Sequence, residues 1–212
     1  MGASMEKAVP FWEDLYRADD VMAFTVEPNK TVVEYERLLD KSANILEAGC
    51  GEGQNVLYLA KRGFRNIDAF DISEAGIAKF KRLCEINGVS VHAFVRDLAK
   101  YVFEKKYDLI MSFAALCFAE KDAWRKFIVN AKDNTNVGGI HIIHIFTDEV
   151  PASADIAPFA VGLAHDGELK ELYNDCEILN FQSYVFEDEH PGVPKHMHSV
   201  NKIVARKSYL GH

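Results

Sequence analysis

The chain lacks the long apolar segments of membrane and secreted proteins. No apolar run approaches the ~20 residues that a membrane-spanning helix requires. The first five residues, MGASM, lack the apolar core of a signal peptide, and position 6 is Glu where a myristoylated start has Ser or Thr. We therefore expect a cytoplasmic protein with no membrane partner, and Met5 offers an alternative start.

Paired cysteines and long basic clusters are also missing. The cysteines lie far apart, with no C-x-x-C pair, at Cys50, Cys84, Cys117 and Cys176. This spacing favours buried, reduced thiols over disulfides or a cysteine metal site. The net charge is −8, and the short basic stretches at 61–62 and 79–82 are typical of solvated helix faces. We therefore expect a small-molecule partner rather than a nucleic acid, and a monomer or homodimer.

The sequence does contain a glycine-rich loop between a strand pattern and a helix pattern. The apolar run 44–48 carries Glu47 and passes into glycines at positions 49, 51 and 53. A helix pattern follows, and the next apolar run ends at Asp71. The order strand, glycine loop, helix, strand, acid is typical of a nucleotide-type cofactor site on an α/β sheet.

The glycine spacing distinguishes between cofactors. A dinucleotide site requires Gly or Ala at the sixth position of G-x-G-x-x-G, where this chain has Gln54. Gly53 instead completes E-x-G-x-G-x-G, which resembles motif I of the class I S-adenosylmethionine (SAM)-dependent methyltransferases. SAM has no pyrophosphate and needs a backbone that it can approach closely. We expect SAM as cofactor and S-adenosylhomocysteine (SAH) as product; a nicotinamide or flavin enzyme, or a SAM-binding protein without turnover, are the alternatives.

Strand and helix patterns alternate along most of the chain. The alternation predicts an α/β fold, a three-layer Rossmann-like sandwich whose mostly parallel seven-stranded sheet ends in an antiparallel hairpin. Expected strands are 44–48, 67–71, 89–95, 107–113, 140–146, 176–186 and 199–207, and expected helices include 8–19, 28–41 and 166–174. The pair Gly138-Gly139 is expected to turn into the fifth strand, and 148–165 to form a long loop.

The length favours a single domain, and the resemblance of its glycine loop to motif I implies a methyltransferase domain. We divide it into an N-terminal helical cap (1–43), a cofactor-binding core (44–147) and a substrate-side loop with the closing hairpin (148–212). A loop as long as 148–165 is usually a lid or a binding segment.

Acidic and small residues follow the predicted strands where they would meet a nucleoside. A carboxylate at Asp71 can accept both ribose hydroxyls, while Asp97 and Leu98 follow the third strand, where an acid would lie beside the adenine. Ser112 and Phe113 end the fourth strand and would line the far side of the cofactor. The other expected contacts come from the glycine loop, its neighbours and the first helix: Glu47, Gly49, Cys50, Gly51, Gly53, Asn55, Ile72, Trp12 and Tyr16. Packing of the first helix on the core would equally explain its two aromatic residues.

The core is similar to the TehB-like tellurite-resistance methyltransferases, which are neighbours of the thiopurine S-methyltransferases. The matching segments are 47–60, 71–73, 107–110, 167–173 and 205–207. The resemblance implies methyl transfer from SAM to a small acceptor, such as a chalcogen oxyanion or a thiol; a small O or N nucleophile is the alternative. The chain lacks N/D-P-P-Y/F after the fourth strand, which disfavours the amino-methylating DNA and RNA enzymes.

Members of this family carry a His/Arg-bearing segment between the last two strands, close to the transferred methyl. The equivalent segment here is 189–198, and it has Lys195 where an arginine is expected. The resemblance implies that His190, Lys195 and His196 are catalytic, orienting an anionic acceptor or removing a proton from a neutral one. His198 shares a strand face with His196, but no Cys or carboxylate stands at ligand spacing, so no metal is expected.

Overall fold

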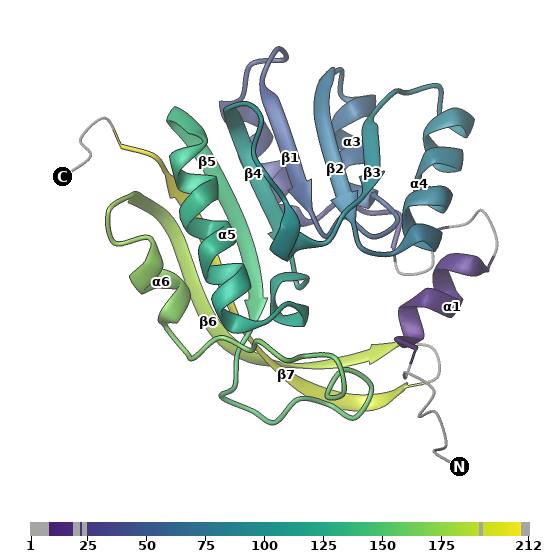
Figure 1. Cartoon of the computed structure of the whole chain (residues 1–212), viewed down its shortest axis with the longest axis vertical. Helices are drawn as coiled ribbons and strands as arrows, with labels where there is room; N and C mark the ends of the chain where they lie inside the picture. The colour runs from purple at the N-terminus through teal and green to yellow at the C-terminus, as the bar shows by residue number, and fades with distance from the viewer. Residues whose placement is uncertain (1–8, 19–21, 23–24, 191–192, 209–212) are drawn as a thin grey trace.

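The fold is built on one mixed sheet, shown in Figure 1, in a computed structural model that describes residues 9–18, 22, 25–190 and 193–208. The seven strands have the order β3-β2-β1-β4-β5-β7-β6. They are β1 (Asn44–Ala48), β2 (Asn66–Asp71), β3 (His92–Val95), β4 (Tyr107–Phe113), β5 (Thr135–Phe146), β6 (Glu177–His190) and β7 (Val193–Arg206). β1 to β5 pair in parallel, and β7 is antiparallel to β5 and β6. The predicted sheet with its closing antiparallel pair is confirmed.

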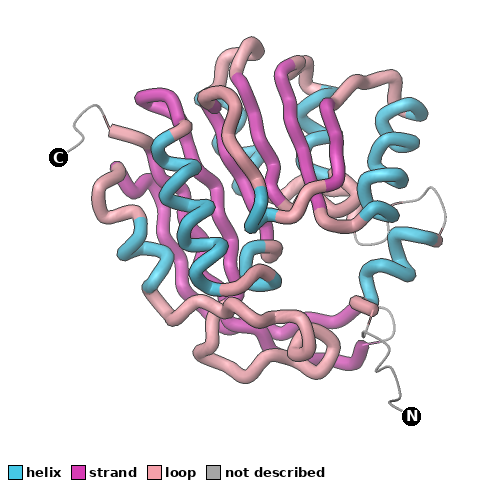
Figure 2. The backbone as a smooth tube through the Cα atoms, viewed as in Figure 1, coloured by secondary structure: helices cyan, strands magenta, loops and turns pink. Residues whose placement is uncertain are grey.

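Helices cover both faces of the sheet, because the central strands are apolar on both sides. In β1, Ile45 packs into one core and Leu46 into the other, and both are fully buried. The first core is covered by α2 (Lys30–Tyr35), α3 (Gln54–Lys61) and α4 (Glu74–Ile86), and the second by α5 (Lys121–Asp133) and α6 (Glu168–Leu172). Figure 2 shows the predicted three-layer arrangement. Within the described part of the chain, none of the helices combines the length and apolarity needed to cross a bilayer.

The ends of the helices follow local signals in the sequence. Ser73 caps α4, since its Oγ accepts a hydrogen bond from the backbone N of Gly76 at 2.9 Å. The helix ends at Ile86 and is followed by its C-cap Asn87 and by Gly88, which has a φ of +63°. The predicted second helix is shorter than expected: α2 ends at Tyr35, and a 3₁₀ turn, η1 (Glu36–Leu38), continues it.

The expected turn at Gly138-Gly139 is wrong, because both glycines lie inside β5. The backbone N of Gly138 donates to the carbonyl of Lys207, and the N of Lys207 donates to the carbonyl of Gly139, each at 2.9 Å. The strand starts at Thr135, five residues earlier than predicted, because the end of the chain supplies these backbone partners. Glycine marks an irregularity of the ladder here rather than a break.

The predicted loop between the last two strands is also largely wrong. β6 and β7 run on as a paired ladder, with Glu187 opposite Met197 and Asp188 opposite His196. Their outer residues are mostly exposed or half-exposed, so no alternation of apolar and polar side chains marks them as strand. Conversely, β3 is shorter than expected and begins at His92.

A buried histidine joins β5 to the helical layer. The ring of His141 contacts the Thr135 hydroxyl through Nε2 and the Tyr173 hydroxyl through Nδ1, both at 2.7 Å. Burial lowers the pKa of His141 to about 3, and the nearby Lys132 and Lys207 lower it further. The neutral ring is therefore the form that the folded protein holds.

We expect acid to destabilise the fold through His141. The unfolded state binds the extra proton below its pKa of about 6.5 and the folded state does not, so the free energy of unfolding falls as the pH drops below this value. Between pH 7 and pH 5, the free energy of unfolding of the wild type should fall by about 1–2 kcal/mol more than that of a His141→Gln variant. Denaturant unfolding at both pH values measures this difference; parallel losses in the two proteins would contradict it.

Candidate functional site

The loop between β1 and α3 carries the three motif glycines in left-handed conformation. Their φ angles are +70° at Gly49, +52° at Gly51 and +80° at Gly53, a region that other residues rarely adopt. A Cβ would also clash with Ala115 at the first position and with the ring of Phe80 at the third. The glycines are therefore required by the packing of the protein itself, in addition to any ligand.

Asp71 ends β2 beside this loop and is bonded to it. Its Oδ2 accepts a hydrogen bond from the backbone N of Gly51 at 2.7 Å, and its Oδ1 accepts one from the backbone N of Ser73 at 2.9 Å. Each carboxylate oxygen can accept a further bond, so Asp71 retains capacity for the hydroxyls of a ligand. Burial raises the pKa of Asp71, and the two backbone N–H groups oppose that shift.

Two buried polar atoms on neighbouring strands lack partners. Asn55 Nδ2 donates to Glu47 Oε1 at 2.8 Å, and Asn55 Oδ1 accepts from the backbone N of Asn29, also at 2.8 Å. The other carboxylate oxygen, Glu47 Oε2, and the Oγ of Ser112 have no hydrogen-bond partner among the described residues. Burial raises the pKa of Glu47 to about 8. Orphaned buried atoms at the ends of β1 and β4 fit a ligand that carries hydrogen-bonding groups.

The turn after β4 is strained and touches the glycine loop. Ala114 has a φ of +53°, unlike any other non-glycine residue of the described chain, and its backbone N donates to the carbonyl of His144 at 2.9 Å. The preceding residue, Phe113, is half-buried, with its ring 4.7 Å from that of His144. Strain of this kind often marks functional sites. No sequence signal points to Ala114, because alanine carries no preference for this conformation.

The remaining predicted cofactor contacts differ in burial. Asp97 accepts from the backbone N of Ala99 at 2.9 Å and so caps the 3₁₀ turn η2 (Leu98–Lys100). Leu98 is half-buried, whereas Ile72 is 68% exposed. Cys50 is buried in the glycine loop, and burial raises the pKa of its thiol. These residues lie at or beside the carboxyl ends of β1, β2 and β3, as predicted.

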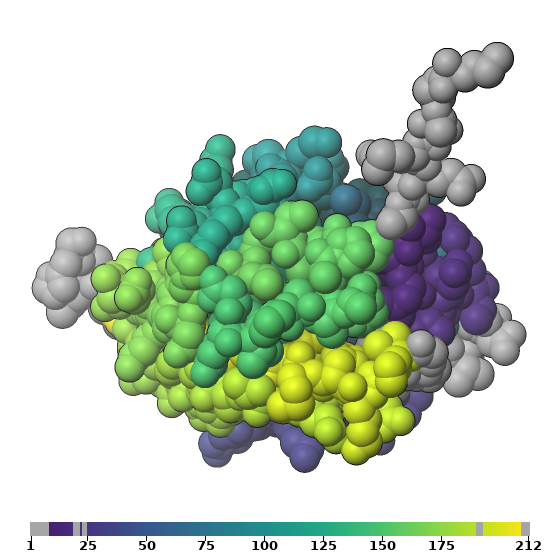
Figure 3. Space-filling view, turned by 90° about the horizontal axis from the view of Figure 1, so that it is seen from below, coloured from purple at the N-terminus to yellow at the C-terminus, as the bar shows by residue number. Residues whose placement is uncertain are grey.

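The first helix, α1 (Phe11–Arg17), covers the glycine loop. The Tyr16 hydroxyl occupies the space that a Cβ at Gly51 would need, and burial, followed by the charge of Asp71, raises the pKa of Tyr16. The Trp12 ring packs against Phe118 of η3 (Leu116–Phe118), with ring centres 4.7 Å apart, and against Phe159, at 5.6 Å. Figure 3 shows α1 (purple), the loop 148–165 (green) and β7 (yellow) meeting on one face.

A buried ion pair holds α1 in place over the glycine loop. Lys79 Nζ lies 3.0 Å from Glu52 Oε2, and the two side chains are 1% and 3% exposed. The same ammonium also donates to the carbonyl of Leu15 in α1 at 3.3 Å. The sequence-based assignment of Lys79 to a solvated helix face is therefore wrong, because α1 covers the side of α4 on which it lies.

The predicted catalytic segment forms the outer part of the β6–β7 hairpin. Lys195 Nζ lies 2.7 Å from Glu187 Oε1, and both side chains are exposed. The two ring atoms His196 Nε2 and His198 Nε2 lie 2.9 Å apart. The side chain of His190 lies outside the described residues.

The expectation that no carboxylate accompanies these histidines is wrong. Asp188 pairs with His196 across the ladder, and its Oδ2 lies 3.9 Å from Nε2 of His198. Asp188 lies eight positions before His196 in the sequence, and the pairing of β6 with β7 brings the two side chains together.

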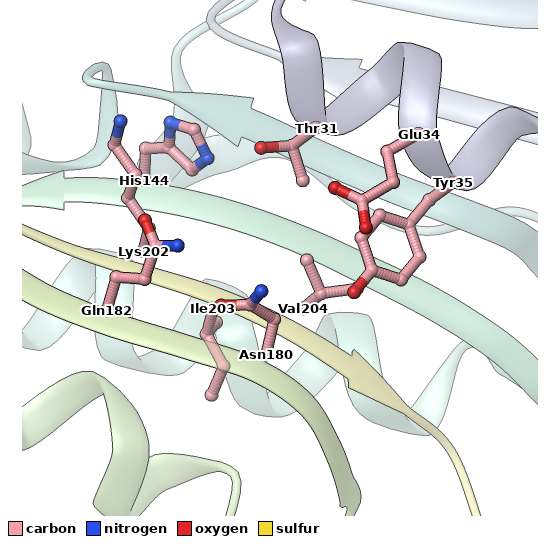
Figure 4. Close-up of a pocket in the computed structure, with 9 residues that line it drawn as sticks. All are labelled: Thr31, Glu34, Tyr35, His144, Asn180, Gln182, Lys202, Ile203 and Val204. Atoms are coloured by element: carbon pink, nitrogen blue, oxygen red, sulfur yellow. The ribbon is translucent and has the colours of Figure 1, made fainter.

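A separate polar pocket lies between α2 and the strands β5, β6 and β7, shown in Figure 4. Burial and the nearby Lys202 lower the pKa of His144 in its wall to about 3. Its lining contains no residue of the glycine loop and none of the predicted catalytic residues: Thr31, Glu34, Tyr35, His144, Asn180, Gln182, Lys202, Ile203 and Val204. This pocket is therefore not the predicted cofactor site.

Comparison with protein families shows the family of the chain. The family described as "Tellurite resistance protein TehB" matches residues 14–191. The chain belongs to the TehB family. The match covers the glycine loop, Asp71 and all of β6, and it confirms the predicted family. Two TehB relatives carry the name of probable SAM-dependent methyltransferases.

The TehB of Haemophilus influenzae resembles the chain in sequence and structure. A protein named "Probable S-adenosyl-L-methionine-dependent methyltransferase TehB" is 32% identical over 145 residues, which cover 68% of this chain and 49% of that protein. The chain thus spans about half the length of this curated relative. The crystal structure of H. influenzae TehB matches with a TM-score of 0.75 and 27% identity, over 85% of this chain and 62% of that one.

A more distant solved structure shares the fold alone. Magnesium protoporphyrin IX methyltransferase from Synechocystis PCC 6803, solved with bound SAM, matches with a TM-score of 0.61 at 16% identity, over 84% of this chain and 77% of that one. The Rossmann-like methyltransferase architecture therefore extends well beyond TehB.

We expect the buried ion pair of Lys79 and Glu52 to be essential for the packing of α1 over the glycine loop. A Lys79→Met change leaves the Glu52 carboxylate buried without its cation and should lower the free energy of unfolding by about 3–5 kcal/mol. The double variant Lys79→Met/Glu52→Met should recover most of this loss, because neither charge is then buried alone. Denaturant unfolding of both variants measures the difference, and a double variant as unstable as the single one would contradict the argument.

Proposed function

We propose that this chain binds SAM at the carboxyl ends of β1, β2 and β4 and transfers its methyl group to a small-molecule acceptor. The observation that carries the proposal is Asp71, whose carboxylate is tied to Gly51 and Ser73 beside a left-handed glycine loop. Both oxygens are held in place before any ligand binds, and both keep acceptor capacity for a ribose.

We assign the other parts of the cofactor to the residues that surround the Asp71 carboxylate. The loop of Gly49, Gly51 and Gly53 offers backbone that the ligand can approach. The unpartnered Glu47 Oε2 suits the amino-acid part, and Ser112, on the neighbouring strand, lines the far side. We assign the adenine side to the ends of β2 and β3, at Ile72, Asp97 and Leu98, and the far side to Phe113. Cys50 and Asn55 support the loop from within, Asn55 through its bond to Glu47.

The chemistry follows from the cofactor and from the exclusion of water. SAM supplies an electrophilic methyl group, so the protein has to position a nucleophile in line with it and keep water away. Trp12, Phe118 and Phe159 form an aromatic contact between α1 and the loop 148–165. With Tyr16 over the glycine loop, this contact covers the site.

We propose a soft anionic acceptor, a chalcogen oxyanion or a thiolate, because the family is named for tellurite resistance. An anion already carries its lone pair and needs orientation rather than a strong base. We propose His190, Lys195 and His196 of the hairpin as the orienting groups. Lys195 Nζ lies 2.7 Å from Glu187 Oε1, and this exposed ion pair would open for an anionic acceptor.

We also propose that residues 1–212 act as one methyltransferase domain in the cytoplasm. The helical cap 1–43 contains α1, whose Leu15 carbonyl is held by Lys79 of the core. The hairpin at the end of the chain completes the sheet of the core. The cap and the hairpin thus both pack on the 44–147 core.

The cofactor assignment predicts the behaviour of an Asp71→Asn variant. The amide offers a single acceptor oxygen, so one of the tethers or the ribose contact is lost, and SAM binding should weaken at least about tenfold. Calorimetric titration with SAM and SAH measures this, with NADH as the negative ligand and Asp175→Asn, at an exposed acid, as the matched control. Unchanged affinity for SAM in the Asp71→Asn variant would remove Asp71 from the ribose role.

The acceptor assignment predicts which compounds consume SAM. Turnover to SAH should appear with tellurite, selenite or a thiol, and a Lys195→Ala variant should raise the KM for an anionic acceptor while leaving the affinity for SAM unchanged. A SAH-release assay over this panel, extended to small amines and alcohols, measures it. Tight SAM binding with no turnover on any acceptor would instead indicate a protein that holds the cofactor without catalysis.

A further inference from the structure

Three potential metal ligands converge on the outer part of the β6–β7 hairpin. The side chains of Asp188, His196 and His198 bring one carboxylate oxygen and two imidazole nitrogens within 4.8 Å of one another. Asp188 is the ladder partner of His196, and His198 follows on the same face two residues later. The three groups are therefore held together by the pairing and the pleat of the two strands. They are not chance contacts between surface side chains.

The hydrogen bonding of His196 directs a lone pair into this cluster. Its Nδ1 lies 2.8 Å from the backbone carbonyl of Pro194, and a carbonyl can only accept, so Nδ1 carries the proton. In the neutral ring, the unprotonated atom is then Nε2, which faces His198. Metal-binding histidines commonly donate their other ring N–H to a carbonyl or a carboxylate, which fixes the tautomer in this way.

His198 is held more firmly than a surface histidine. Its side chain is 5% exposed, its ring stacks on Phe146 with centres 4.5 Å apart, and Phe186 packs against it at 5.6 Å. The position of its ligand atom is therefore fixed by packing. Asp188, at 43% exposure, leaves the cluster open to solvent on one side, which provides a path for an ion and an open coordination position.

The distances suit a single ion. Two nitrogens bound at about 2.0–2.1 Å to one tetrahedral centre lie roughly 3.3 Å apart. The separation of His196 Nε2 and His198 Nε2 is 2.9 Å, and that of His198 Nε2 and Asp188 Oδ2 is 3.9 Å. Changes of about half an ångström would bring these two separations to the value for a shared tetrahedral ion, and all three ligand atoms lie within 4.8 Å of one another.

We propose that Asp188, His196 and His198 form a binding site for a divalent first-row transition metal, with Zn²⁺ the best match to two imidazoles and one carboxylate. The site lies beside Phe146, at the carboxyl end of β5, which is the edge of the sheet where the glycine loop and the turn after β4 also lie. Resting on the proposed function, we further assign the open position of the metal to the anionic acceptor. His196 would then orient the acceptor through the ion.

The test is metal binding by the full chain without an affinity tag, stripped with a chelator. Calorimetric titration with Zn²⁺ should show one equivalent bound with micromolar or tighter affinity, and Co²⁺ should give the intense visible absorption of a low-symmetry site. His196→Ala and Asp188→Asn, both at partly exposed positions, should each weaken Zn²⁺ binding at least about tenfold. His92→Gln, which removes a histidine paired with Asp68 at 3.0 Å far along the sheet, is the matched control and should bind as the wild type does.

The outcomes separate this inference from the proposed function. Absence of saturable Zn²⁺ binding, or equal binding by the His196→Ala variant and the wild type, would overturn the metal site. SAM titration of the same variants reports on the cofactor site independently, and the His196→Ala variant should keep wild-type affinity for SAM. Metal binding without SAM binding would retain the metal site and remove the methyltransferase.

Discussion

The left-handed turn after β1 is the constraint on which the rest of the site depends. The backbone N–H groups of Gly49 and Cys50 both donate to the carbonyl of Phe70, at 2.8 and 3.0 Å, and lock the turn to the end of β2. Non-glycine residues in this conformation would each cost about 1–2 kcal/mol. A Cβ at these positions would also clash with a neighbouring segment; at Gly49, for example, it would clash with Ala115. One short loop thereby brings the carboxyl ends of β1, β2 and β4 into contact.

Contacts of α1 and the loop 148–165 turn this open edge into a covered site. The buried pair of Lys79 and Glu52 ties α1 to α4 and to the glycine loop, because the same ammonium also reaches the carbonyl of Leu15. On the other side, Trp12 reaches Phe159 of the loop 148–165. The loop is itself anchored, since the carbonyl of Gly162 accepts from Trp124 Nε1 at 2.7 Å. Polar anchoring beneath an aromatic cover suits a reaction that has to exclude water.

The sequence predicted the central strands well and the periphery less well. β1 and β4 have the predicted bounds, because buried parallel strands are apolar without interruption and are bounded by turn residues. The bounds of β5 to β7 were missed, since Gly138 is paired by Lys207 and the outer hairpin is polar on both sides. The strain at Ala114 and the burial of Lys79 were missed for the same reason: each depends on a segment that is distant in the chain.

The sequence by itself determined the family and the succession of strands and helices along the chain, because motif spacing and apolar periodicity are local properties of the chain. It placed Asp71 at the end of a strand and the glycines before a helix, and the structure brings them into direct contact. Only the tertiary structure decided which charges are buried, which aromatic residues cover the site, and that Asp188 stands beside His196 and His198. Those features arise from pairing and packing between segments, and no local pattern records which segment will become the neighbour of another.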